Sequence, residues 1–315
     1  MDGSRRAFIK KMGTVSCAVP LVSNPLNFLS SDELDKPLTV HLFSKHLHFL
    51  DWKEAAQSAA KIGFQGLDLT VRPKGHVLPE NVKRDLPKAV RDINGAGLSC
   101  DMITTAISDA NSLVDEEVIK TAAAEGVKFY RSNWFSYMND ISLEESLDYY
   151  KATVRQLAEL NKSYGIVGCY QNHSGLKIGA SVWEVKKILE DADPKYFGAQ
   201  YDIRHAIAEG GKSWPNGVQL LRSQIKTIAL KDFKWDKVEG KWNIVNVPIG
   251  EGMVDFKTYF KQLKSYGLNP PVSLHLEYPL GGAEKGRTEI KVDQQVVFDA
   301  MNKDLDTIQR FWKEA

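Results

Sequence analysis

Short apolar runs and amphipathic segments alternate along the chain from Pro37 onward. The runs have the length of buried strands, and the amphipathic segments repeat their apolar positions with the period of a helix. The alternation recurs eight times, which predicts a (β/α)8 TIM barrel of the α/β class. A doubly wound open sheet is the alternative. It usually contains a glycine-rich phosphate-binding turn, which this chain lacks.

The boundaries of the expected elements follow from turn residues and helix-capping residues. The expected strands cover residues 38–43, 66–71, 98–105, 127–131, 165–173, 197–202, 225–232 and 272–277. The expected helices cover residues 51–62, 79–96, 115–125, 142–164, 181–189, 214–221, 254–266 and 292–312. Residues 233–252 are rich in Trp and Lys and have no helical period, so we expect an ordered loop or a hairpin there.

The first 35 residues are a different kind of segment. Arg5 and Arg6 precede a modestly apolar stretch, residues 12–29, in the order that is typical of an export signal. The paired arginines resemble a twin-arginine signal and predict a periplasmic protein, with a disordered basic tail as the alternative. The stretch is too weak and too rich in proline for stable membrane insertion. We therefore divide the chain into a leader, 1–35, and one barrel domain, 36–315.

Composition excludes some classes of partner. With 41 Lys and Arg against 40 Asp and Glu, the chain has no basic excess for binding nucleic acid. A hydrophobic content of 43% is ample for one large core. Cys100 and Cys169 lie in apolar contexts, and together with Cys17 they show no metal-binding spacing, so we expect buried free thiols. Oligomer formation is left open.

Polar side chains end four consecutive expected strands. Gln171 and His173 end the fifth, Asp202 the sixth, Lys231 the seventh and Glu277 the eighth. Alternate residues of a strand point the same way, and the carboxyl ends of barrel strands surround the active site. Polar groups that follow buried apolar runs cost free energy unless they share a wet pocket. The sequence therefore predicts a site at this mouth of the barrel.

Each of these side chains also has a purely structural interpretation. Asp202 can cap the helix that follows its strand. Lys231 and Asp232 can form a solvated ion pair at a strand end. His173 can donate a hydrogen bond to a loop carbonyl, and His275, deeper in its strand, suits a core histidine whose hydrogen bonds are satisfied.

Three motifs recur together in one known family. They are Asp202-x-x-His205, Leu230-Lys231-Asp232, and the run at 247–256 before a final strand that ends in Glu277. As a set they resemble the sugar phosphate isomerase/epimerase family of xylose isomerase-like TIM barrels, over residues 37–312. Segments 67–72 and 75–79 are similar to an exported branch of that family. The resemblance implies a carbohydrate as the small-molecule partner.

The resemblance also implies a divalent metal ion, Mn, Mg or Zn. Metal-dependent members hold it with Glu, Asp, His and Glu at the ends of strands five to eight. Those positions are Gln171, Asp202, Ala229 and Glu277 here. An amide oxygen is a poor ligand for these ions and alanine is none. The implied metal site is therefore Asp202 with Glu277, weakened unless His173 or His205 substitutes.

The implied reaction is proton transfer next to the carbonyl of a sugar or keto-sugar, giving isomerisation, epimerisation or elimination. Such chemistry needs a base and an electrophile. We expect Glu277 as the base, Lys231 as the electrophile and His173 as a further catalytic residue. We also expect burial to raise the pKa of Glu277, with Lys231 countering that shift.

The remaining expected site residues bind substrate. They are Arg72, His76, Gln171, His205 and Trp134, the last by stacking on a sugar ring. A non-catalytic carbohydrate-binding barrel is the alternative function. A nuclease of the related endonuclease barrel type is disfavoured, because it needs a dense set of His and acidic ligands and a basic groove.

Overall fold

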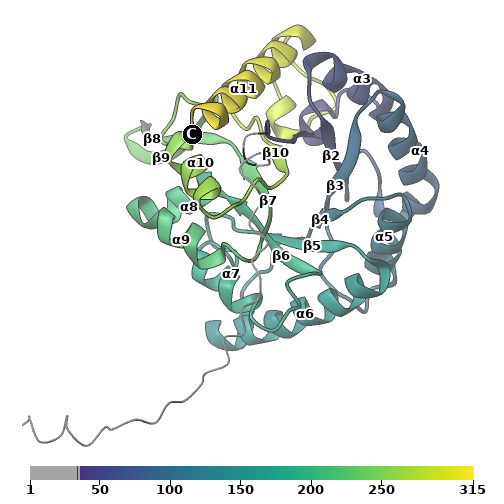
Figure 1. The fold of residues 1–315 in the computed structure, drawn as a ribbon, viewed down its shortest axis with the longest axis vertical. Helices are drawn as coiled ribbons and strands as arrows, with labels where there is room; N and C mark the ends of the chain where they lie inside the picture. Colours follow the sequence, from purple (N-terminus) through teal and green to yellow (C-terminus); the bar gives the residue numbers. More distant parts are fainter. Residues whose placement is uncertain (1–33, 35) are drawn as a thin grey trace, which may run out of the picture.

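The computed structural model describes residue 34 and residues 36–315. Eight parallel strands close into a barrel in the order β1-β10-β7-β6-β5-β4-β3-β2. Helices surround this barrel on all sides (Figure 1). The structure confirms the predicted TIM barrel. The predicted leader, including Arg5, Arg6 and Cys17, lies outside the described residues.

Two barrel strands, β2 and β6, have the predicted bounds, and the other six are shorter than the predicted runs. They are β1 (Val40–Phe43), β2 (Gly66–Val71), β3 (Ser99–Thr105), β4 (Phe129–Arg131), β5 (Val167–Gln171), β6 (Phe197–Asp202), β7 (Ile225–Leu230) and β10 (Val272–Leu274). The last strand was expected to reach Glu277, but its pairing stops at Leu274. Glu277 therefore belongs to the segment that leaves the strand.

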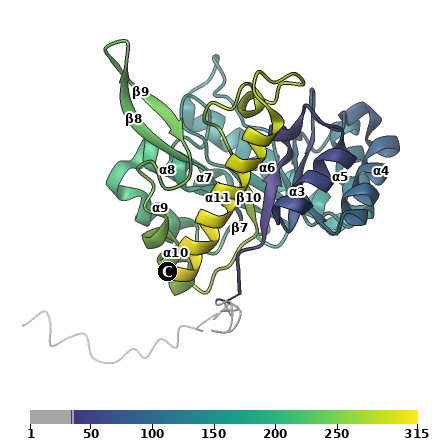
Figure 2. The ribbon, with the colours of Figure 1, turned by 90° about the horizontal axis from the view of Figure 1, so that it is seen from above.

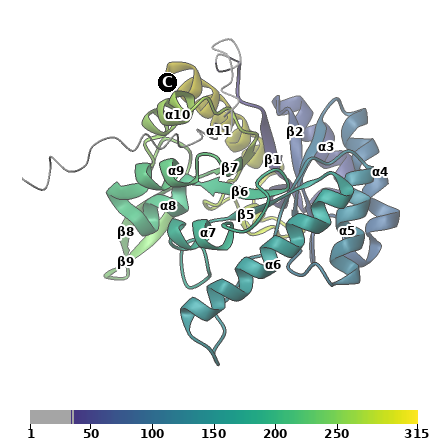
Figure 3. The ribbon, with the colours of Figure 1, turned by 60° about the horizontal axis from the view of Figure 1, so that its bottom comes forward.

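Nine α-helices are found among the described residues, and four short 3-10 turns join them. The helices are α3 (Trp52–Ile62), α4 (Val82–Gly95), α5 (Leu113–Ala124), α6 (Leu143–Tyr164), α7 (Val182–Ile188), α8 (Ile203–Gly210), α9 (Trp214–Leu221), α10 (Phe256–Ser265) and α11 (Gln294–Glu314). The turns are η1 (Ser44–Leu47), η2 (Pro79–Asn81), η3 (Gly211–Ser213) and η4 (Ala283–Lys285). Figure 3 shows α6 along one side of the barrel, with α7 beside it. The sequence interpretation allowed for α8 only as the helix that Asp202 can cap, without giving its bounds.

Local signals explain where the long helices begin and end. The Ser142 side chain accepts from the Glu145 backbone, and Glu145 in turn accepts from the Ser142 backbone, which forms a capping box at the start of α6. Asp51 and Glu54 form the same box before α3. Gly63 ends α3 with φ 109°, a left-handed conformation that favours glycine.

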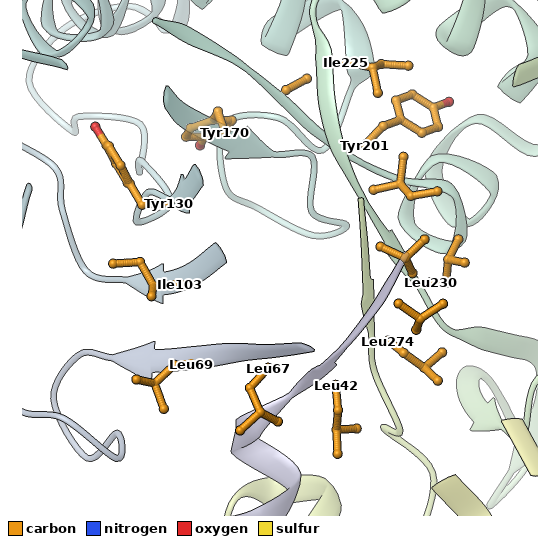
Figure 4. Packing of buried hydrophobic residues seen from close by; sticks show 14 of the residues in the cluster. Leu42, Leu67, Leu69, Ile103, Tyr130, Tyr170, Tyr201, Ile225, Leu230 and Leu274 are labelled. Carbon is orange, nitrogen blue, oxygen red and sulfur yellow. The ribbon is translucent and has the colours of Figure 1, made fainter. Parts of the chain in front are cut away.

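Alternation along the strands separates two environments. Apolar side chains such as Leu42, Leu69 and Tyr201 point outward into the buried layer between strands and helices (Figure 4). Polar side chains point inward. Ser273 Oγ of β10 donates to Asp68 Oδ2 of β2 at 2.5 Å, although these two strands are not neighbours in the barrel. The bond therefore crosses the interior, which is polar.

Two further predictions are confirmed. The segment after β7 forms an antiparallel hairpin of β8 (Asp232–Val238) and β9 (Lys241–Val247), which projects away from the barrel (Figure 2). Cys100 and Cys169 are buried free thiols. Among the described residues, no helix has the length and apolar character needed to cross a membrane.

Candidate functional site

Three adjacent strands bring Asp202, Lys231 and Glu277 together at one mouth of the barrel. Lys231 Nζ lies 3.3 Å from Asp202 Oδ2 and 3.3 Å from Glu277 Oε1. Asp202 and Lys231 are buried, whereas 24% of the Glu277 side chain is exposed. Glu277 is therefore the most accessible member of this cluster. Asp232 is also buried, so the solvated Lys231–Asp232 pair is wrong.

Asp202 is both a helix cap and a site residue. Its Oδ1 accepts from the backbone N–H of His205 at 3.0 Å and caps α8. Its Oδ2 accepts from Gln171 Nε2 at 2.8 Å and faces Lys231. The Asn172 side chain holds the Asp202 backbone through two hydrogen bonds, of 2.8 and 2.9 Å. The two interpretations of Asp202 hold together because a carboxylate has two oxygens.

Glu277 lies beside two ammonium groups and a buried histidine. Beyond Lys231, its Oε1 is 3.7 Å from Lys45 Nζ and 3.6 Å from His275 Nδ1. Burial raises the pKa of Glu277, but Lys231, His275 and Lys45 outweigh burial and hold that pKa well below its usual range. The expected net rise of the Glu277 pKa is therefore wrong. Two ammonium groups at the same carboxylate, rather than one, account for the difference.

Two histidines follow β5 and β6 and lie face to face. The ring centroids of His173 and His205 are 4.0 Å apart. His205 Nδ1 accepts from Arg204 Nη1 at 2.9 Å, so the proton of the neutral ring is on Nε2, 3.6 Å from Asp202 Oδ2. Burial, followed by Lys231, holds the pKa of His205 well below its usual range. His205 is therefore neutral and oriented.

His173 satisfies its structural interpretation and still lies in the site. Its Nδ1 is hydrogen-bonded to the Ser174 carbonyl at 2.9 Å, as a loop histidine would be. The centroid of its ring lies 4.5 Å from that of the Trp134 ring. Arg131 stacks over Trp134 at 4.2 Å and donates to Gln171 Oε1 at 3.5 Å. Trp134 is therefore connected to the cluster of Asp202, Lys231 and Glu277 through His173 and Arg131.

A cavity of about 600 Å³ opens beside Trp134. Its wall comes from the loops after β3 and β4 and from α6, and it includes Asn111, Asn133, Trp134, Tyr149 and Gln156. Amide groups and aromatic rings together suit a sugar, which presents hydroxyls at its edge and C–H groups on its face.

The two predicted residues of the loop after β2 lie differently. His76 Nδ1 is 3.1 Å from Ser44 Oγ and its Nε2 is 3.2 Å from the Leu50 carbonyl, so it joins two loops. Arg72 is half-buried with its guanidinium 5.5 Å from the Phe43 ring, and Phe43 stacks on His275 at 4.3 Å. Arg72 thus lies on the rim of the site. The structure does not bring His76 to the Lys231 cluster.

Sequence reasoning missed Lys45, Arg131, Asn172, Ser174 and Arg204. The rule that found Lys231 also applies to two of them. Arg131 is the last residue of β4, and Lys45 follows the last residue of β1 by two positions. Testing every strand end for a polar residue in the inward register would have found both. The other three act through hydrogen bonds that no strand pattern predicts.

Asp232 fixes the chain immediately after Lys231. Its Oδ2 accepts from the backbone N–H groups of Gly250 and Gly252 at 2.9 and 3.0 Å, and its Oδ1 accepts from Val254 at 3.2 Å. A Cβ at Gly252 would lie 2.2 Å from Asp232 Oδ1. The Asp232 carboxylate therefore holds the Leu-Lys-Asp motif (residues 230–232) against the Gly-Glu-Gly motif (residues 250–252), on the far side of the hairpin.

Comparison with known proteins shows a shared family and fold. The family model described as xylose isomerase-like TIM barrel matches residues 56–295. No curated protein matches the chain. The structure of a 3-keto-D-glucoside 4-epimerase from E. coli is 14% identical, covers 86% of this chain and 99% of its own, and has a TM-score of 0.60. That of a D-psicose 3-epimerase from Clostridium cellulolyticum, solved with D-tagatose, is 13% identical, covers 88% and 100%, and has a TM-score of 0.65.

A third similar structure bears on the metal. A xylose isomerase-like TIM barrel protein from Mycobacterium smegmatis in complex with magnesium is 11% identical, covers 88% of this chain and 98% of its own, and has a TM-score of 0.62. The residues of the present chain do not fit such an ion. Lys231 Nζ lies between the two carboxylates, and Gln171 turns its N–H toward Asp202. Within 36–315, no three His, Cys, Asp or Glu side chains are grouped to hold a metal.

Proposed function

The chain belongs to the xylose isomerase-like TIM barrel family, and on that premise we propose that it is an enzyme that moves a proton next to the carbonyl of a sugar or keto-sugar. The observation that carries this proposal is the Lys231 ammonium 3.3 Å from both Asp202 and Glu277. It places a partly exposed carboxylate and a fixed positive charge side by side, as enolate chemistry requires.

In the proposed step, Glu277 takes a proton from the carbon beside the carbonyl. The electrons of the broken C–H bond form a C=C bond, and the carbonyl electrons move onto oxygen, where the Lys231 ammonium stabilises the enolate. When Lys231 turns to that oxygen, Glu277 loses its closest cation and becomes a stronger base. Asp202, held by Gln171 at 2.8 Å, keeps Lys231 in place.

The fate of the enolate decides the product. Proton return to the opposite face of the same carbon gives an epimer. Return to the former carbonyl carbon, together with transfer of the neighbouring hydroxyl proton to the former carbonyl oxygen, gives an isomer. Departure of a group from the next carbon completes an elimination. Lys45, 3.7 Å from Glu277, is the second group that can exchange a proton. Burial lowers the pKa of Lys45, which suits such exchange.

The cavity beside Trp134 is the proposed place for the rest of the sugar. Its amide-bearing and aromatic wall lies next to His173, at the edge of the cluster. Trp134 stacks on the ring face, Gln171 and His205 orient hydroxyls, and Arg72 closes the rim. His76 supports the loop that carries Arg72 rather than contacting the sugar.

Solvent deuterium exchange tests this proposal. A panel of keto-sugars and keto-glycosides in D2O is expected to gain deuterium next to the carbonyl with the wild-type protein. Glu277→Gln is expected to slow the exchange at least about 100-fold while sugar binding persists, because the amide keeps the shape but cannot take a proton. Sugar binding without exchange in the wild type would instead support a non-catalytic carbohydrate-binding barrel.

We also propose export to the periplasm by the twin-arginine route, on the basis of Arg5 and Arg6 before a weakly apolar stretch. Cell fractionation is expected to recover the wild type in the periplasm and the Arg5→Lys/Arg6→Lys variant in the cytoplasm. Lys10→Arg, which leaves the pair intact, serves as the control. Periplasmic recovery of the double variant would refute this route.

A further inference from the structure

The cation of this site is part of the chain. Lys231 reaches from the end of β7 to 3.3 Å from a carboxylate oxygen of each neighbouring strand. We propose that the Lys231 ammonium takes the place of the divalent cation in this barrel mouth and supplies the positive charge of the reaction. The claim that Lys231 supplies the charge of the reaction rests on the proposed function. The claim that Lys231 excludes a metal ion does not.

The hydrogen bonds of Asp202 support the replacement of a metal ion by the Lys231 ammonium. Its Oδ1 is used by the His205 backbone, and its Oδ2 by Gln171 Nε2 and Lys231. Gln171 cannot easily present its oxygen instead, because that oxygen accepts from Arg131 Nη1 at 3.5 Å. A divalent ion would find Asp202 already satisfied by donors and facing N–H groups. Ala229, the remaining strand-end position, offers no ligand atom.

The charge around the mouth points the same way. Lys45 and Arg131 both interact electrostatically with Glu277. Arg72 in turn repels Lys45 and Arg131. The interacting set comprises four cations, Lys45, Arg72, Arg131 and Lys231, and three carboxylates, Asp68, Asp202 and Glu277. A divalent ion would add to an existing positive excess in a partly buried place, where repulsion is weakly screened.

An ammonium also changes what the electrophile can do. It offers three N–H donors, so it can stay beside Asp202 while the donor that faces Glu277 turns to a substrate oxygen. A metal ion that bridged the same oxygens would need ligands at 2.0–2.6 Å and a larger coordination set. The Lys231 arrangement needs neither, and this explains how Gln171 and Ala229 are compatible with an intact site.

The first test uses the wild-type protein and no substrate. Calorimetric titration with Mn²⁺ is expected to show no binding at this site up to millimolar concentrations, and elemental analysis of the purified protein is expected to show no stoichiometric divalent metal. Dialysis against a chelator is expected to leave the melting temperature unchanged. Stoichiometric metal that contacts Asp202 and Glu277 would overturn the proposal.

The second test removes the ammonium. Lys231→Ala leaves Asp202 and Glu277 facing an open space, and Mn²⁺ affinity is expected to rise at least tenfold over wild type. Adding Ala229→His and Gln171→Glu to it is expected to raise the affinity further. Lys226→Ala, which removes a half-buried lysine from the same strand, is the matched control and is expected to gain nothing.

Two outcomes of the variants decide the matter. If Lys231→Ala folds only with Mn²⁺, the ion has replaced the ammonium and the proposal stands. If Lys231→Ala and the triple variant bind Mn²⁺ no better than Lys226→Ala, Lys231 does not occupy a cation position and the proposal fails. Neither readout involves turnover, so a failure here is distinct from failure of the deuterium exchange.

Discussion

Asp202 uses its two carboxylate oxygens for different purposes. Oδ1 begins α8 and Oδ2 receives Gln171 and Lys231. A substitution can separate these purposes, because asparagine is about as good a helix cap as aspartate but carries no charge. The same separation tests whether the ion pair or the cap makes this residue important.

Asp202→Asn is expected to lower kcat/KM at least about 100-fold, with effects on both kcat and KM, since a misplaced Lys231 impairs binding and chemistry. Loss of one partner of a buried ion pair is also expected to cost about 3 kcal/mol of unfolding free energy. Steady-state kinetics and chemical denaturation measure the two effects. Asp293→Asn, at the cap of α11, controls for the change of cap and is expected to alter neither. A stable, active Asp202→Asn would contradict the assignment.

At the scale of elements, Asp232 and the turn that contains Gly250 and Gly252 join the hairpin to the barrel. Asn246 of β9 makes a second connection, since its Nδ2 donates to the Glu277 carbonyl at 3.3 Å and its Oδ1 accepts from Arg204 at 2.7 Å. The hairpin therefore positions the segment that carries Glu277, although it projects away from the barrel.

Gly252→Ala is expected to destabilise the protein by roughly 1–3 kcal/mol, because the new Cβ would overlap the Asp232 carboxylate and the Phe233 carbonyl. Turnover is expected to fall as well, since the displaced Asp232 adjoins Lys231. Gly95→Ala is the control: nothing lies within 4 Å of its Cβ, and alanine is favoured in a helix. Thermal unfolding of both variants would show the contrast, and an unchanged Gly252→Ala would rule out a tight turn.

The elements themselves were largely predictable, because period and capping residues act locally. The barrel followed from the alternation of strands and helices, and the hairpin from a segment with no helical period. The cluster of Asp202, Lys231 and Glu277 followed from the polar residues at the strand ends. The bounds of α8 were not predicted because the helix begins directly after Asp202, with no turn residue between strand and helix. The sign of the Glu277 pKa shift was missed because Lys45 comes from the turn η1 after β1, far from Glu277 in the sequence.

At the scale of the whole molecule, α11 closes the barrel and buries an acid. Asp304 accepts from the Ile249 backbone at 3.2 Å and from the Tyr278 hydroxyl at 3.0 Å, so it ties the last helix to the hairpin return and to the segment after Glu277. Burial raises the pKa of Asp304 from 3.8 to about 7. The folded protein therefore binds a proton there that the unfolded chain releases.

Stability is expected to fall as pH rises from about 4 to about 7, because over this range the unfolded chain has released the proton that the folded state still binds; the total is at most about 4 kcal/mol. Asp304→Asn has no proton to lose, so its melting temperature is expected to fall less than that of the wild type between pH 5 and pH 8. Asp306→Asn, an exposed change on the same helix, is the control. Parallel pH profiles for wild type and Asp304→Asn would exclude this role.

A cation attached to the backbone has no dissociation equilibrium. A ligand that binds the folded state stabilises it by an amount that grows with the logarithm of the free ligand concentration. The stability of a barrel that binds a free metal ion therefore depends on the metal concentration. Lys231 is present at full occupancy whenever the chain is folded, and mass action cannot remove it. The midpoint of unfolding in this protein is therefore expected to be the same in metal-replete and metal-starved media.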